Sequence, residues 1–166
     1  MSIIALITWI TAAGGGLYLL SIWLIEYDKE FQAAAATRLP PIVLASHVTL
    51  AVGGLIVWAG YLLFDNDQLI LVAALAIVLA AMLGSFMASR WIGVYREFRA
   101  IQRAATPQQA ASQPGVNSQQ LATLTRPVQI GPPERNFPLP VVIGHGAFAL
   151  ATITMVLLIA FGIGTS

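Results

Sequence analysis

Cysteine is absent from this sequence of 166 residues, and charged residues are scarce. Without cysteine the chain can form no disulfide, no thiolate metal site, no iron–sulfur cluster and no covalent c-type haem attachment. Only 9% of its residues are charged, whereas about a quarter are charged in a soluble domain. So few charges cannot cover the surface of a globular protein in water. Part of this chain must therefore be surrounded by lipid.

The charges that are present exclude further classes. The formal net charge of +1 argues against a nucleic-acid partner. No acidic residue lies well inside an apolar run, although proton-coupled carriers and ion channels normally need such groups there. No set of nucleophile, base and orienting group is visible, so a hydrolase is not expected.

Four apolar runs are long enough to cross a bilayer as helices, which takes about 20 residues. They cover about 3–25, 40–64, 69–89 and 139–163. The first run lacks the basic start and the short apolar core of a signal peptide, so we interpret it as a retained span. The sequence therefore predicts an all-α integral membrane protein, a single transmembrane domain with an up-down four-helix bundle.

Residues 104–137 differ in composition from the rest of the chain. They are rich in glutamine, serine, alanine and proline, and they show no apolar periodicity. Such a segment cannot bury enough surface to offset the entropy of ordering it. We predict a long polar loop outside the membrane between the third and fourth helices.

Arginine and lysine indicate the orientation. All of them lie in the connections after the first and third runs, at Lys29, Arg38, Arg90, Arg96, Arg99, Arg103, Arg126 and Arg135. The turn between the second and third runs carries only Asp65 and Asp67. The positive-inside rule places both basic connections in the cytoplasm and both termini outside, as expected for a protein of a bacterial plasma membrane.

Each of the two histidines of the chain stands at the end of a stretch, and the two stretches are similar. The stretches begin at Arg38 and Arg135, continue through two prolines and branched apolar residues, and reach His47 and His145. Each histidine stands five or six residues after the second proline, so both lie at a similar depth in runs that point the same way. In an up-down bundle these two runs are diagonal, and both side chains can face the bundle axis.

A pair of neutral imidazoles on facing helices is the usual way to hold b-type haem in a membrane. His47 and His145 are therefore candidate axial ligands of one haem iron near the cytoplasmic face. Arg38, Arg90 and Arg135 are candidate partners of the haem propionates. A single histidine in such a helix more often bonds to a neighbouring helix. A metal site without porphyrin would lack nearby carboxylate and thiolate ligands.

In its four-run layout and its two histidine stretches, the chain resembles small four-helix membrane b-type cytochromes and haem-bearing membrane anchor subunits of respiratory enzymes. It departs from the two-haem cytochromes of the b561 type, which use four histidines. The resemblance implies one bis-histidine haem b and one-electron transfer, with quinone as a redox partner. It also implies other membrane subunits as partners, because one haem near one face cannot carry electrons across the bilayer. On this view the chain is at most an electron-transfer subunit.

A second hypothesis assigns the chain to a different class of protein. The chain would be an accessory or assembly subunit without a cofactor, packed on a larger membrane complex. Faces of small residues, the long polar loop and the short length of the chain suit this hypothesis equally.

Overall fold

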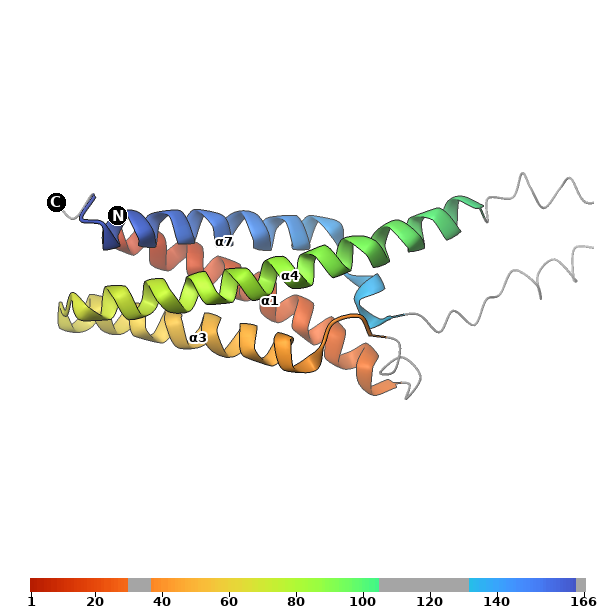
Figure 1. The fold of residues 1–166 in the computed structure, drawn as a ribbon, viewed down its shortest axis with the longest axis horizontal. Helices are drawn as coiled ribbons and strands as arrows, with labels where there is room; N and C mark the ends of the chain where they lie inside the picture. The colour runs from red at the N-terminus through yellow and green to blue at the C-terminus, as the bar shows by residue number, and fades with distance from the viewer. Residues whose placement is uncertain (30–36, 105–131, 164–166) are drawn as a thin grey trace, which may run out of the picture.

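The computed structural model describes residues 1–29, 37–104 and 132–163, and this part of the chain contains helices and no strand. The long helices are α1 (Ser2–Lys29), α3 (Pro41–Phe64), α4 (Gln68–Ala104) and α7 (Leu139–Ala160), and the short 3-10 helix η1 (Pro133–Asn136) precedes α7 (Figure 1). All four long helices are long and apolar enough to cross a membrane. The prediction of an all-helical integral membrane protein is thus confirmed.

The helices form two antiparallel pairs. α3 packs along α4, and α1 packs along α7, while α4 against α7 and α1 against α3 join the two pairs. α3 and α7 therefore occupy opposite corners of the bundle. The start of α1, the end of α7 and the α3–α4 turn share one end of the bundle, which we call the terminal end (Figure 1). The opposite end, where η1 lies and α4 extends beyond its neighbours, is called the connection end.

Prolines start α3 and α7 in the same way. Pro40 and Pro138 are the N-cap residues, both with extended backbone, and a further proline stands in the first turn of each helix. The carbonyl of each N-cap proline accepts the N–H groups of the third and fourth residues after it, at 3.0 and 3.1 Å. His47 and His145 are each the seventh residue after the N-cap, which places both roughly 10 Å into their helices. The two stretches therefore share one register.

The hydrophobic core lies toward the terminal end and is built around two tryptophans. Trp58 is fully buried, and its ring centroid lies 6.4 Å from that of Trp9. The Trp9 Nε1–H donates to the carbonyl of Ala51 at 3.1 Å, and the Trp58 Nε1–H donates to that of Ser2 at 3.2 Å. Both indoles thus have hydrogen-bond partners in an apolar surrounding, as buried tryptophans require.

The last part of the predicted polar loop is folded. Residues 133–136 form η1, and Pro133 and Glu134 within it are buried. Residues 105–131 of the predicted loop lie outside the described residues. The polar and proline-rich composition of this stretch does not predict a buried acidic residue.

Candidate functional site

The structure brings the two histidines together. His47 on α3 and His145 on α7 have ring centroids 6.2 Å apart, with 74° between the ring planes. Because α3 and α7 occupy opposite corners, the pair reaches across the middle of the bundle. The two rings come together because each histidine is the seventh residue after the N-cap of its helix.

Each histidine is fixed by the other helix of its pair. The Nδ1 atom of His47 lies 2.8 Å from the carbonyl oxygen of Ala80 on α4. The Nδ1 atom of His145 lies 2.8 Å from the carbonyl oxygen of Ala12 on α1. A carbonyl oxygen only accepts, so Nδ1 carries the hydrogen in both rings.

A glycine stands one helical turn after each of these alanines. A Cβ atom at Gly84 would lie 3.1 Å from Cε1 of His47, and one at Gly16 would lie 3.0 Å from Cε1 of His145. Both distances are tighter than nine in ten real Cβ contacts, so a side chain at either glycine would require the histidine ring beside it to shift. The α3–α4 pair and the α7–α1 pair thus hold their histidines through the same kinds of contact, an alanine carbonyl and a glycine one turn later.

The signal for this arrangement is present in the sequence. Both supporting helices carry two alanines, two variable residues and a glycine, at 12–16 and at 80–84. This repeat was not among the features predicted from the sequence. Its meaning depends on which helix lies beside which histidine, and only the packing supplies that information.

A cavity of about 140 Å³ lies beside the histidine pair. Its wall is almost entirely apolar, and it extends toward the connection end, where Trp23, Leu39, Trp91 and Phe137 line it. Met87 also lines it, whereas Met82, one and a half turns earlier on α4, is 64% exposed. The cavity thus offers the two imidazoles and a thioether within an apolar surrounding.

Glu134 lies at the connection end, and the sequence did not single it out. Its side chain is fully buried. Oε1 accepts the backbone N–H of Arg38 at 2.6 Å, and Oε2 accepts the hydroxyl of Thr37 at 3.1 Å. The backbone carbonyl of Glu134 accepts the Nε1–H of Trp91 at 3.2 Å. One residue therefore links η1 to the start of α3 and to α4.

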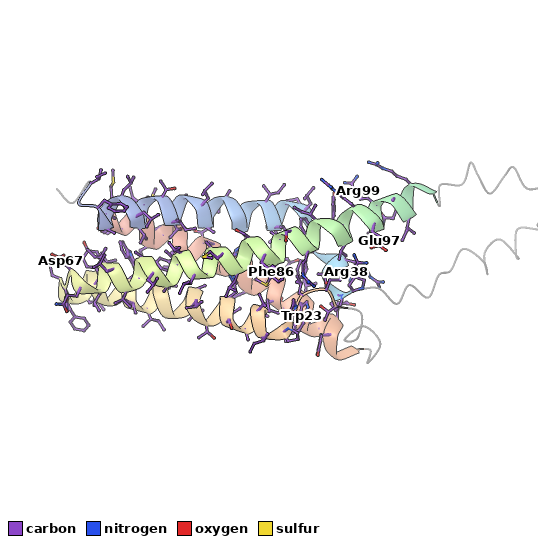
Figure 2. The ribbon with its side chains drawn as sticks, viewed as in Figure 1. Trp23, Arg38, Asp67, Phe86, Glu97 and Arg99 are labelled. Atoms are coloured by element: carbon purple, nitrogen blue, oxygen red, sulfur yellow. The ribbon has the colours of Figure 1, made fainter. Side chains whose placement is uncertain are left out.

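The three arginines proposed as propionate partners lie at the connection end, and none of them lines the cavity. The Arg38 guanidinium pairs with Glu97 at 2.7 Å between Nη2 and Oε2, and Figure 2 shows the two side chains close together. Arg90 donates to the backbone carbonyl of Arg38 at 3.0 Å, and its guanidinium lies 5.0 Å from the ring centroid of Phe86. Arg135 lies in η1, directly after Glu134.

Comparison with known proteins gives one partial match. The chain is 35% identical over 101 residues to NADH-quinone oxidoreductase subunit N 2 of Symbiobacterium thermophilum. The matched region is 60% of this chain and 18% of the relative, so the chain spans under a fifth of that protein. No family model and no solved structure matches the chain.

The interpretation of the chain as a b-type cytochrome that transfers electrons through one bis-histidine haem is wrong. The relative is by its name a subunit of NADH-quinone oxidoreductase and not a cytochrome. Within the described residues no three side chains of histidine, cysteine, aspartate or glutamate gather to hold a metal ion.

Proposed function

We propose that this protein is an accessory or assembly subunit of a larger membrane complex. The partial match to a subunit of NADH-quinone oxidoreductase carries the proposal, because it links the chain to a protein named as one subunit among others. The match covers only 18% of that relative, so what the whole relative does is not carried over to this chain.

The outer faces of the helices support the proposal. In the most apolar part of each span, only 11–28% of the residues are buried within the chain. The remaining surface must face lipid or other helices. On α7, Gly146 and Ala147 are exposed, and nothing lies within 4 Å of a Cβ placed at Gly146. Small residues at membrane depth allow another helix to approach closely, so we assign this α7 face to a neighbouring subunit.

The charges at the two ends support an orientation within a bacterial plasma membrane. The connection end carries Arg38, Arg90 and Arg99 together with further arginines of α4, while the terminal end carries Asp65 and Asp67. The positive-inside rule assigns the connection end to the cytoplasm and both termini to the outside. In this orientation the extension of α4 beyond its neighbours projects toward the cytoplasm, where it can meet soluble parts of a complex.

The proposal is tested by extraction of the tagged protein from its native membrane in a mild detergent, followed by native electrophoresis and mass spectrometry. We expect one band far above the mass of a 17.7 kDa chain with its detergent, containing other integral membrane subunits in fixed ratio. A band of the isolated chain alone, under conditions that keep a known respiratory complex intact, would contradict the proposal.

A further inference from the structure

Each histidine of the pair leaves one ring nitrogen for a ligand. Because Nδ1 of His47 and Nδ1 of His145 donate to carbonyls, Nε2 of each neutral ring carries a lone pair. Neither Nε2 has a hydrogen-bond partner within the described residues. Every fully enclosed side-chain nitrogen or oxygen in this part of the chain has a partner, so neither Nε2 is fully enclosed. Both histidines line the cavity.

This bonding pattern is characteristic of metal-binding histidines. Such a histidine binds the ion with one nitrogen and donates its other N–H to a carboxylate, a water or a backbone carbonyl, which fixes the tautomer and the orientation of the ring. Ala80 and Ala12 provide that carbonyl for His47 and His145. Gly84 and Gly16 leave room for this orientation, because a Cβ at either position would lie within 3.1 Å of the ring beside it.

The spacing of the rings also fits one shared ion. A metal–imidazole bond is about 2.0–2.1 Å long, and the ring centre lies roughly a further 1 Å away, so imidazoles on opposite sides of an ion have centroids roughly 6 Å apart. The observed separation between the centroids of His47 and His145 is 6.2 Å. The 74° between the planes is compatible, because rotation about a metal–nitrogen bond leaves that separation unchanged.

The surroundings select the kind of ion. No third histidine, cysteine, aspartate or glutamate joins the pair within the described residues, so the four protein ligands of a structural zinc site are not available. The sulfur-bearing side chain of Met87 lines the same cavity. Thioether and imidazole ligands suit monovalent copper, and a single charge costs less to bury in an apolar site than a double charge.

We propose that His47 and His145 bind one monovalent copper ion through their Nε2 atoms, with the sulfur of Met87 as a weaker third ligand. The proposal goes beyond the accessory role and does not depend on it. A chain that assembles with other subunits and binds no copper, or the reverse, would separate the two.

The full chain in lipid nanodiscs is titrated with Cu(I) under anaerobic conditions against a colorimetric Cu(I) chelator. We expect one ion per chain. His47→Leu and His145→Leu should each weaken binding more than about 100-fold, because even the outer partners of metal ligands contribute 10–100-fold. Met87→Leu should weaken it about tenfold, and Met82→Leu is its matched control, since the exposed Met82 does not line the cavity.

Glycine variants provide a second test that retains every ligand. Gly84→Ala should displace the His47 ring and weaken Cu(I) binding at least about tenfold, because loss of the outer support of a ligand has this size. Gly144→Ala, next to His145, adds a methyl group with nothing within 4 Å and should bind as the wild type does. Nitrogen NMR of labelled histidine in the ion-free protein should show hydrogen on Nδ1 of both rings.

Three results would overturn the proposal. The first is no stoichiometric Cu(I) binding by a wild-type chain whose helicity and elution volume are normal. The second is binding that persists when His47→Leu and His145→Leu are combined. The third is a native protein that is isolated with an organic molecule in this cavity in place of a bare ion.

Discussion

The carboxylate of Glu134 accepts the backbone N–H of Arg38 at 2.6 Å, although 96 positions separate the two residues in the chain. This hydrogen bond connects η1 to the residues that precede α3. Leu39 and Phe137, which follow these two bonded segments in the chain, line the cavity beside the histidine pair.

Loss of the Glu134 carboxylate should therefore loosen the connection end. We expect Glu134→Ala to lower the free energy of unfolding by about 2–4 kcal/mol, because the part-buried donors at Arg38 and Thr37 lose their acceptor. Unfolding in mixed detergent micelles, followed by tryptophan fluorescence, measures the change.

Glu97→Ala is the matched control. Glu97 also pairs with Arg38, but the two side chains are 57% and 50% exposed. An exposed pair contributes about 0–1 kcal/mol, so this variant should change stability little. Equal losses from both variants would show that burial of Glu134 does not matter for stability.

Two adjacent glycines on α3 should differ sharply in their tolerance of a methyl group. A Cβ at Gly54 would lie 2.9 Å from the indole of Trp9 and 3.0 Å from Cβ of Ala76, whereas nothing lies within 4 Å of one at Gly53. We expect Gly54→Ala to cost about 1–3 kcal/mol by overpacking. Gly53→Ala should be neutral or stabilise by up to about 1 kcal/mol, because alanine favours a helix. The same unfolding assay decides, and similar effects at both positions would contradict this packing of α1 on α3.

The composition of the chain made most of the fold predictable. Four apolar runs of sufficient length can satisfy their backbone in lipid only as helices, so the helical class followed directly from their length. The meeting of His47 and His145 was also accessible from the sequence, because similar proline stretches start both helices and set one register.

Other features depend on contacts between distant segments. Glu134 lies among prolines and polar residues, and nothing local distinguishes it from a solvated residue. The carbonyls of Ala12 and Ala80 carry no side-chain signature at all, and they became visible only once each helix had its neighbour. The cytochrome interpretation went wrong at this step, since two facing histidines do not define what they bind.

The absence of cysteine makes the orientation easy to test with single introduced cysteines. Asp67→Cys places a thiol at the exposed terminal end, and Arg99→Cys places one on the exposed extension of α4 (Figure 2). We expect a membrane-impermeant maleimide to label the first in intact cells and the second only after permeabilisation, because arginine-rich connections remain in the cytoplasm. The opposite pattern would invert the proposed orientation.

The accessory role predicts a protein neighbour on one defined face, and photo-crosslinking in the native membrane tests this most directly. A photo-crosslinking residue is introduced in place of the exposed Ala147 on α7 and, as a control, in place of Ile56 on α3, which is 66% exposed. We expect position 147 to give one discrete product with an integral subunit of a respiratory complex, and position 56 to give only lipid adducts. The absence of any protein adduct from position 147, with efficient crosslinking to lipid there, would contradict the proposed role.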